Sequence, residues 1–503
     1  MNLSFLENGA AMAPGDLRSW LAEVDRRGAL VRVPRAHWNL EIGGITEVNN
    51  REGEHNALLF EDIPDCETGR VLTCATSNLA SLTATLRTNA QTKRDLVEYL
   101  RGGRITAWAD AAREAPFEWI DDGPVFEHRD RGSDIDLFRF PVPLWHSHDG
   151  GRYIGTGCAV ITMDPDTGSY NAGAYRCMVA GKDRVTVVMG SASRHGKQHH
   201  LKYQRRNEPC PMVISFGHDP LIALLAGIEL PEGVFEIDVA GVIANQRAQM
   251  CRGPITGLPI PAHAELVAEG WLTDEMADEG PFGEFTGYYA GAREPRPVMR
   301  IEALYYRENP IILGSPPGRP PHDFSHQWSI LRSALLQDQL ALAGVPGVTA
   351  VWADEVGGGR LLITVAIKQR YPGHAKQAAA IASQCGAGAY FGRYVIVVDD
   401  DIDPTDLRDV MWAVATRSDP ERDIDILRNT WGSPVDPLRE VMGRKADFNS
   451  RGLIDACRPF EYLDTFPPTA ASTPEELGVI RKKWSTIWHP ETVSVSDIRL
   501  RSD

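Results

Sequence analysis

The sequence lacks three features, and each absence excludes a broad class of protein. No stretch approaches the roughly 20 consecutive apolar residues that a helix needs to cross a bilayer, so we expect no membrane partner. The segment Met1 to Pro14 has no basic region followed by an apolar run, which does not fit a secretory signal. The 52 lysines and arginines are outnumbered by 68 aspartates and glutamates, and this acidic balance argues against a nucleic-acid partner.

Cysteine is also sparse. The chain has eight cysteines, and no two of them form a CxxC pair. Structural zinc sites and thioredoxin-like redox sites usually contain such pairs, so neither is indicated. Scattered single cysteines are typical of reduced thiols, and we therefore expect a cytoplasmic protein.

The distribution of apolar residues divides the chain into parts with different patterns of predicted helices and strands. Its length of 503 residues predicts about three domains. Apolar residues with helical spacing predict a helix over Asp16 to Arg27, and helices and strands alternate to about residue 115. From Phe140 to about Pro316, short strands joined by tight turns predict a β-meander or barrel.

The third part returns to alternating helices and strands. We predict a helix from His326 to Ala343 capped by Ser325, and a second helix from His374 to Gln384. Strands are predicted over Arg360 to Ile367 and Tyr394 to Val398. The last fifty residues are richer in polar residues and proline, and we interpret them as an arm.

The segment from Glu279 to Glu284, Glu-Gly-Pro-Phe-Gly-Glu, is the most informative motif. Glycine and proline favour an ordered turn over a helix or a ladder strand. A turn with an acid at each end can direct both carboxylates into one cavity, where their pKa values are pushed apart. Taken alone, the segment is more typical of a surface turn with two solvated acids.

Upstream segments add Asn171, Arg176, His195 and Glu236. Asparagine, histidine and glutamate together form a mixed oxygen and nitrogen ligand set, which favours Mg²⁺ or Mn²⁺ over structural zinc. Each of these residues alone also fits an ordinary surface or strand-end position. Their order and approximate spacing, followed by the segment from Glu279 to Glu284, resemble the UbiD family of decarboxylases, which use prenylated flavin mononucleotide (FMN).

The resemblance extends over nearly the whole chain. Further matching segments are Asn39 to Ile42, Pro141 to Leu144, Asp149 to Ile154 and Asp399 to Asp403. It implies a mixed α/β fold with a central split β-barrel that holds the flavin and the metal. The implied parts are an N-terminal α/β domain (1–118), the barrel (119–324), a C-terminal α/β oligomerisation domain (325–450) and an arm (451–503).

The resemblance also implies roles for individual residues. Mn²⁺ or Mg²⁺ is bound by Asn171, His195 and Glu236, and K⁺ is held nearby by backbone carbonyls. The catalytic network consists of Arg176, Glu279 and Glu284. The implied cofactor-binding residues are Asn171, Ala174, Tyr175, Arg176, Arg194, His195 and Glu236.

The implied reaction is a reversible, non-oxidative decarboxylation of an aromatic, heteroaromatic or α,β-unsaturated acid. Arg176 holds the substrate carboxylate, Glu279 tunes the site, and Glu284 delivers a proton after CO₂ leaves. The expected partners are the carboxylic acid, CO₂, a flavin prenyltransferase that supplies the cofactor, and further copies of the chain in a homodimer or an assembly of dimers.

Some positions depart from the family pattern or have two interpretations. Gly386 stands where some family members have a lysine that contacts the flavin phosphate. His322 and His326 either contact the substrate or belong to a polar loop before a helix. Tyr175, Phe282, Phe285 and His322 are candidates for shaping the pocket.

The rival hypotheses are a metal-dependent hydrolase that uses Asn171, His195 and Glu236, with Glu284 as base, and a non-catalytic flavin-binding protein.

Overall fold

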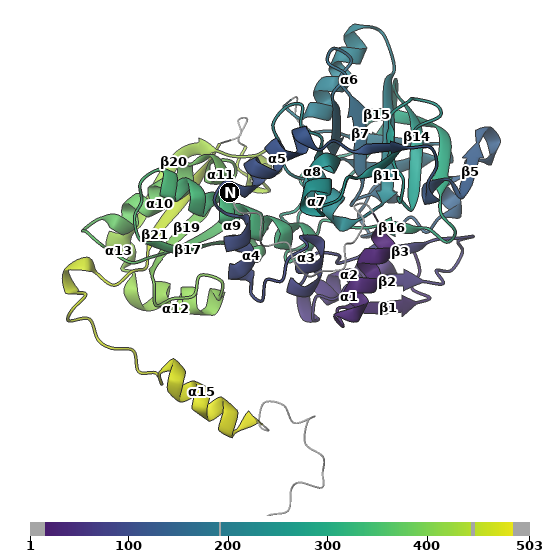
Figure 1. The fold of residues 1–503 in the computed structure, drawn as a ribbon. Coiled ribbons are helices and arrows are strands. Elements are labelled where there is room, and N and C mark those ends of the chain that lie inside the picture. Colours follow the sequence, from purple (N-terminus) through teal and green to yellow (C-terminus); the bar gives the residue numbers. More distant parts are fainter. Residues whose placement is uncertain (1–15, 191–192, 444–447, 486–503) are drawn as a thin grey trace, which may run out of the picture. The chain divides into compact units, whose positions relative to one another are not determined.

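The computed structural model describes residues 16–190, 193–443 and 448–485. The segment Met1 to Pro14, on which the signal-peptide prediction depends, lies outside these residues. The chain divides into two compact units, Met1–Cys457 and Arg458–Asp503. Helices and strands are mixed throughout the first unit, so the predicted α/β class is confirmed (Figure 1).

A four-stranded sheet forms the N-terminal part, which is purple in Figure 1. Its last strand, β16, comes from the end of the central part and pairs in parallel with β3. The two parts therefore share a sheet. The strands, in order across the sheet, are β1 (Leu30–Pro34), β2 (Ala57–Glu61), β3 (Arg70–Thr73) and β16 (Ile311–Leu313). The helices are α1 (Leu17–Arg26), α2 (Glu41–Glu52), α3 (Leu79–Thr85), α4 (Lys93–Leu100) and α5 (Arg104–Glu114).

Helix α1 forms where the spacing predicted it. The Asp16 carboxylate accepts a hydrogen bond from the backbone N–H of Arg18 at 3.1 Å and so caps the helix. The apolar face is buried against the sheet, which accounts for the stability of a helix this short. The buried residues are Leu17, Trp20, Leu21 and Val24.

A nine-stranded antiparallel sheet forms the central part and curls into the predicted split barrel. The strand order is β6-β9-β10-β15-β14-β11-β7-β8, and β5 pairs with β15. The strands are β5 (His128–Arg131), β6 (Tyr153–Gly155), β7 (Ala159–Met163), β8 (Tyr170–Gly173), β9 (Arg176–Gly181), β10 (Arg184–Val188), β11 (Cys210–Gly217), β14 (Leu266–Glu279) and β15 (Glu294–Tyr306).

Short helices and a small sheet complete this part. The helices are α6 (His195–Arg205), α7 (Pro220–Ala226), α8 (Glu236–Ile243) and the 3₁₀ turns η1 (Pro124–Phe126), η2 (Gly132–Asp134) and η3 (Leu137–Arg139). The small sheet contains β4 (Glu118–Ile120), β12 (Gln249–Arg252) and β13 (Pro259–Pro261).

Both faces of the nine-stranded sheet are buried. Along β11, Met212 and Ile214 belong to one core cluster, whereas Val213 belongs to a second cluster. Successive side chains of a strand point to opposite faces, so the two clusters cover the two sides of the sheet. Close packing on both sides limits the movement of the strand ends, where several of the predicted site residues stand.

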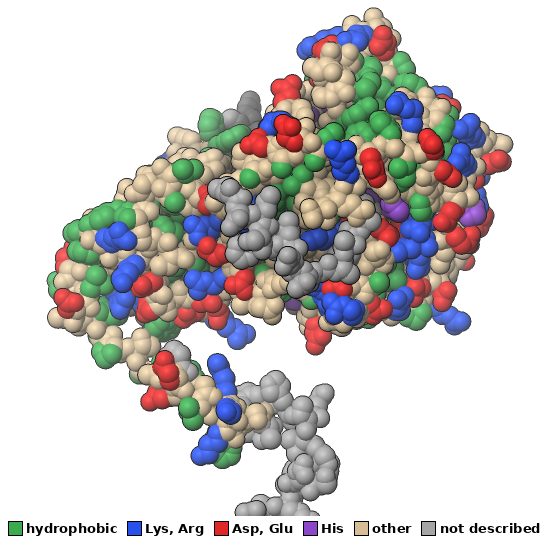
Figure 2. Space-filling model, in the orientation of Figure 1, with side chains coloured by type: hydrophobic (Ala, Val, Ile, Leu, Met, Phe, Trp, Pro, Cys, Tyr) green, Lys and Arg blue, Asp and Glu red, His purple; other side chains and the backbone are tan. Residues whose placement is uncertain are grey.

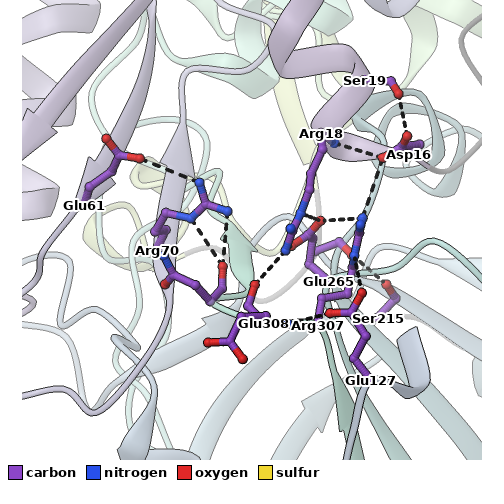
Figure 3. Close-up of polar contacts among 12 residues, drawn as sticks. Asp16, Arg18, Ser19, Glu61, Arg70, Glu127, Ser215, Glu265, Arg307 and Glu308 are labelled. Carbon is purple, nitrogen blue, oxygen red and sulfur yellow. Dashed lines mark hydrogen bonds and ion pairs between the residues drawn. The ribbon is translucent and has the colours of Figure 1, made fainter. Parts of the chain in front are cut away.

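A polar cluster joins α1 to the central sheet, and Figure 3 shows its members converging on Glu265. The Glu265 side chain is fully buried and accepts hydrogen bonds from Arg18 Nε at 2.9 Å and Arg307 Nη1 at 3.2 Å. Arg18 also donates to the backbone carbonyl of Glu308 at 2.8 Å. One buried carboxylate therefore connects two arginines from distant parts of the sequence.

The C-terminal part of the first unit is a five-stranded sheet in the order β17-β18-β19-β21-β20. Its strands are β17 (Val348–Ala353), β18 (Leu362–Ile367), β19 (Tyr394–Asp399), β20 (Ile424–Trp431) and β21 (Phe448–Asp455). Its helices are α9 (Asp323–Leu342), α10 (His374–Gln384), α11 (Gly386–Ala389), α12 (Leu407–Arg417), α13 (Pro420–Asp423), α14 (Leu438–Val441) and the turn η4 (Glu355–Gly357).

Two predicted boundaries in this part were wrong. The cap of α9 is His322 rather than Ser325, because the His322 ring accepts the Ser325 N–H and the Ser325 hydroxyl accepts the His322 N–H. Strand β18 begins at Leu362 rather than Arg360. Gly358 and Gly359 adopt left-handed φ values of +65° and +66°, and the resulting turn places Arg360 in a loop.

The second unit, Arg458–Asp503, contains the turn η5 (Phe460–Tyr462) and helix α15 (Pro474–Lys483). The predicted arm, residues 451–503, begins inside β21, and its last residues lie outside the described part. None of the described helices has both the length and the apolar content required to cross a membrane. On the face drawn in Figure 2, acidic and basic side chains are interspersed.

Candidate active site

A cavity of about 450 Å³ lies between the central sheet and the C-terminal part. This volume is in the range of small-molecule and cofactor sites. One wall comes from β8, the first turns of α6 and α8, and the segment after α7; the other comes from α9 and nearby loops. Its charged and amide-bearing residues are Asn171, Arg194, His195, Glu229, Glu236 and Arg360. Its aromatic residues are Tyr175, Phe285, Phe324, Trp328 and Tyr390.

The three predicted metal ligands all line this cavity. Asn171 lies on β8, while His195 and Glu236 are the first residues of α6 and α8. The fold therefore brings these side chains together at one cavity, although Asn171 and Glu236 are 65 positions apart in the sequence. Ala174, Tyr175 and Arg194, which were predicted to bind the cofactor, line the same cavity.

Glu236 is buried, with 3% of its surface exposed, and forms no ion pair within the described chain. One carboxylate oxygen accepts the backbone N–H of Ala172 at 2.7 Å. Burial raises the pKa of Glu236 to about 8, which reflects the cost of an uncompensated buried charge. A divalent cation would supply the missing positive charge, so the oxygen and nitrogen donors present here fit such a metal.

The amide of Asn171 is buried and incompletely hydrogen-bonded. Its side-chain nitrogen is buried and has no hydrogen-bond partner within the described residues. No three histidine, cysteine, aspartate or glutamate side chains in the described part are arranged to hold a metal ion. A metal bound here would therefore depend on the amide oxygen of Asn171 as well as on His195 and Glu236.

Tyr175 explains the run of small residues between Asn171 and Arg176. A Cβ on Gly173 would lie 2.3 Å from the Tyr175 ring, and a Cβ on Gly196 would lie 2.7 Å from it. The ring is thus held between two glycines, and its hydroxyl accepts the Gly196 N–H at 3.2 Å. Tyr175 couples the β8–β9 turn to the start of α6, where His195 stands.

The predicted catalytic residues form a single hydrogen-bonded cluster. Arg176 Nε and Nη2 each donate to one oxygen of Glu279 at 3.0 Å, and Arg176 Nη1 donates to Glu284 at 3.2 Å. The planar guanidinium that the sequence analysis assigned to a substrate carboxylate therefore binds Glu279 in a bidentate manner. Only the edge at Nη1 faces Glu284.

The two carboxylates have different environments. Glu279 is 1% exposed, and it also accepts the Tyr153 hydroxyl at 2.7 Å. The Glu284 side chain is 24% exposed. Burial raises the pKa of Glu284, the charge of Glu279 raises it further, and Arg176 opposes the shift. Glu284 is thus more readily protonated than an ordinary solvated carboxylate.

Two motifs that are distant in the sequence hold this cluster in place. Glu279 ends β14, and the following loop packs against the segment that contains Gly150. The Gly150 N–H donates to the Pro281 carbonyl at 2.8 Å, and any Cβ at Gly150 would overlap the Gly280 carbonyl. The rings of Phe282 and Tyr153 stack at 3.8 Å, which positions the Tyr153 hydroxyl on Glu279.

The cluster lies beside the cavity rather than in its lining. Arg176, Glu279 and Glu284 do not line it, but their chain neighbours Tyr175 and Phe285 do. Of the predicted pocket-shaping residues, Tyr175 and Phe285 line the cavity, whereas Phe282 is buried against Tyr153.

His322 and His326 have structural contacts in this conformation. The Nε2 atom of His322 donates to the Phe285 carbonyl at 3.2 Å, and its Nδ1 atom accepts the Ser325 N–H. Burial lowers the pKa of His322 to about 4, so the ring is neutral at pH 7. His326 lies 3.5 Å from Glu355, and neither histidine lines the cavity.

Part of the cavity wall was not predicted from the sequence. Trp328 and Phe324 on α9 and Tyr390 after α11 had no motif to identify them, since aromatic residues on a helix are usually core residues. Arg360 was assigned to a strand. The preceding run of three glycines, Gly357 to Gly359, was a signal for a turn that could have exposed this error.

Family models match the chain in three consecutive segments. They are described as the N-terminal, Rift-related and C-terminal domains of 3-octaprenyl-4-hydroxybenzoate carboxy-lyase (UbiD), and they match residues 21–100, 119–320 and 325–456.

Curated relatives are similar over almost their full length. A phenolic acid decarboxylase of Streptomyces sp. strain D7 is 30% identical over 92% of this chain and 97% of its own length. A pyrrole-2-carboxylic acid decarboxylase of Pseudomonas aeruginosa is 31% identical over 91% of this chain and 94% of its own.

A solved structure has the same fold. The UbiD-class enzyme HmfF from Pelotomaculum thermopropionicum, in complex with FMN, superposes with a TM-score of 0.79 at 27% identity. The match covers 92% of this chain and 98% of HmfF. An evolved dimeric form of HmfF with prenylated FMN has a TM-score of 0.75 and 26% identity. The three consecutive family matches and the full-length relatives show that this chain belongs to the UbiD family of carboxy-lyases.

Proposed function

We propose that this protein is a prenylated-FMN-dependent decarboxylase of an aromatic or heteroaromatic carboxylic acid. The observation that carries the proposal is the Arg176 cluster, in which one arginine joins two carboxylates of unequal environment beside a cofactor-sized cavity. The phenolic and pyrrole acids named for the relatives support an aromatic substrate over an acrylic one.

The cofactor belongs in the cavity that Asn171, His195 and Glu236 line. When bound, prenylated FMN supplies the electron sink that removal of CO₂ from an sp² carbon requires. The three residues would hold Mn²⁺ or Mg²⁺, with K⁺ on nearby backbone carbonyls. Ala174, Tyr175 and Arg194 line the same space and would contact the cofactor.

Arg176 positions the substrate through its remaining edge. Because Glu279 occupies Nε and Nη2, we assign the substrate carboxylate to Nη1, which now donates to Glu284. A substrate carboxylate at this position adds negative charge beside Glu284. That charge further favours the protonated form of Glu284 while the substrate is bound.

Glu284 then donates its proton to the carbon that has lost CO₂, and it regains a proton from solvent at its partly exposed side chain. Glu279 keeps its two hydrogen bonds from Arg176 and fixes the orientation of the guanidinium. The reverse sequence, in which Glu284 removes the ring proton, accounts for a reversible reaction. The protein would work as a homodimer or an assembly of dimers, with a flavin prenyltransferase as cofactor supplier.

A substrate panel tests the proposal. The protein is produced with and without a flavin prenyltransferase, and CO₂ release is measured for phenolic, pyrrole, furan and acrylic acids, together with the absorbance spectrum and the metal content. We expect turnover of aromatic or heteroaromatic acids only in the sample made with the prenyltransferase. Turnover restricted to acrylic acids would reject the substrate class. Hydrolytic turnover that depends on metal but not on flavin would favour the hydrolase hypothesis.

A further inference from the structure

Arg360 is a cavity residue to which neither the family resemblance nor the proposed mechanism gives a role. It follows the turn formed by Gly358 and Gly359, just before β18. A Cβ on Gly358 would lie 2.7 Å from the Phe285 ring, and a Cβ on Gly359 would lie 2.8 Å from the Ser329 nitrogen. The turn is therefore packed tightly against the wall of the cavity, and it fixes where the Arg360 side chain begins.

The guanidinium of Arg360 lies between two aromatic rings. Its central carbon is 5.6 Å from the centre of the Trp328 ring and 5.1 Å from that of Tyr390. Both rings also line the cavity. Stacking of this kind holds a guanidinium in place while its N–H edge remains available for an anion.

Most of the hydrogen-bonding capacity of Arg360 is unused. Of the five N–H donors that a guanidinium carries, the only hydrogen bond found among the described residues is from Nη1 to the Tyr390 carbonyl at 3.1 Å. In the same part of the chain, Arg360 has no acidic partner within ion-pair distance. Burial lowers the pKa of Arg360 to about 10, so it remains a cation at neutral pH. A partly buried cation without a counter-charge at a cavity is costly, which favours binding of an anion there.

The position of Arg360 in the cavity favours one anion. Arg194 and Glu229, whose charges act on Arg360, line the same cavity, and Arg194 directly precedes His195, one of the proposed metal ligands. Gly386, where some family members have a lysine for the flavin phosphate, begins α11, the short helix that directly precedes the cavity residue Tyr390.

We propose that Arg360 binds the terminal phosphate of the flavin and replaces the lysine that this chain lacks. The inference rests on the proposed function, because it requires that the cavity holds a flavin. A guanidinium can donate two parallel hydrogen bonds to phosphate oxygens, so it is chemically suited to this role. The second anion with similar chemistry is an additional carboxylate on the substrate, and the test separates the two.

The test compares binding of FMN and riboflavin, which differ only in the phosphate, to flavin-free protein in the presence of Mn²⁺. Binding is followed by quenching of flavin fluorescence, a measurement independent of turnover. We expect Arg360→Gln to weaken FMN binding about 10- to 100-fold, the usual cost of losing a charge-assisted hydrogen bond. Riboflavin binding should change less than about 3-fold. Arg408→Gln, on the exposed face of α12, is the matched control and should leave both affinities unchanged.

A second variant covers the possibility that Arg360→Gln does not fold. Arg360→Lys retains the charge but loses the paired donors, and we expect an FMN-specific loss of about 3- to 10-fold. An unchanged ratio of FMN to riboflavin affinity in a folded variant overturns the inference. If that ratio holds while the KM rises for dicarboxylic acids alone, Arg360 contacts the substrate instead. Wild-type protein that binds no flavin would reject the proposed function itself.

Discussion

In two clusters of this protein, arginine and glutamate share hydrogen bonds in opposite proportions. At the junction of α1 and the central sheet, two arginines, Arg18 and Arg307, converge on the single carboxylate of Glu265 (Figure 3). Beside the cavity, Arg176 donates to both Glu279 and Glu284, and Arg296 lies 3.9 Å from Glu279.

The proportions decide what each cluster can do. Glu265 has more positive than negative charge in immediate contact, and its fully buried carboxylate functions as a fixed link between chain segments. Arg176 cannot satisfy two carboxylates equally. Glu279 takes the bidentate position, and the pKa of Glu284 is raised by burial and by its neighbour's charge. A carboxylate that shares its arginine with a second carboxylate thus suits the proposed proton donor, whereas a carboxylate that accepts from two arginines forms a structural clamp.

The largest effect on activity is expected when Glu284, the proposed proton donor, is replaced. Glu284→Gln keeps the shape and the hydrogen bond to Arg176 but carries no transferable proton. Decarboxylation should fall by about 10²- to 10⁴-fold, the range for loss of a general acid. Flavin content, measured by absorbance, should be unchanged. Turnover close to that of the wild type in this variant would remove Glu284 from the mechanism.

Breaking the structural clamp should affect stability instead of chemistry. Glu265→Gln leaves two arginines without their shared counter-charge, and we expect a loss of about 3 kcal/mol in the free energy of unfolding. The measurement is urea denaturation followed by tryptophan fluorescence. Glu302→Gln, an exposed change on neighbouring β15, is the control and should stay within about 0.5 kcal/mol of the wild type. Equal stability of the two variants would contradict a structural role for Glu265.

The pH profile tests the unequal sharing of Arg176. In the proposed mechanism, protonated Glu284 is the active form, so kcat should decrease as the pH rises through the pKa of Glu284. Glu279→Gln removes the charge that raises this pKa and frees Arg176 to stabilise the Glu284 carboxylate. The basic limb of the profile should therefore move to lower pH. If the basic limb stays at the same pH or moves to higher pH in Glu279→Gln, a group other than Glu284 controls it.

The smallest effect is expected from removing one arm of the clamp. Arg18 is 35% exposed, and Arg307 would still compensate Glu265 after its loss. Arg18→Gln should therefore cost about 1 kcal/mol or less, as is usual for a partly solvated ion pair. A loss as large as that of Glu265→Gln in the same urea experiment would mean that Arg307 contributes nothing to the clamp.

Local sequence patterns were sufficient for much of the fold. The helix after Asp16 and helix α10 form where the apolar spacing predicted them, since amphipathic helices depend on residues close in sequence. The errors occurred where a tertiary contact overrides a local preference. Ser325 is a good capping residue, but His322 caps α9, and the neighbouring Asp323 binds Ser77 from the N-terminal part.

The residues of the candidate site also fall into those that sequence motifs identified and those that only tertiary contacts revealed. Motif resemblance identified Asn171, His195, Glu236 and the segment from Glu279 to Glu284, and all three proposed metal ligands line one cavity. It did not identify Arg360, because the environment of this residue comes from Trp328 and Tyr390, which are distant in the sequence.

The sequence by itself determined the mixed α/β class, the family and the residue types available for chemistry. Each depends on local periodicity or on ordered motifs that one chain displays. Only the tertiary structure decided that Glu279 occupies the paired edge of Arg176 while Glu284 keeps a raised pKa. It also placed Arg360 at the cavity. Burial, competition for one guanidinium and unpaired charge arise from contacts between distant segments, and no stretch of sequence contains them.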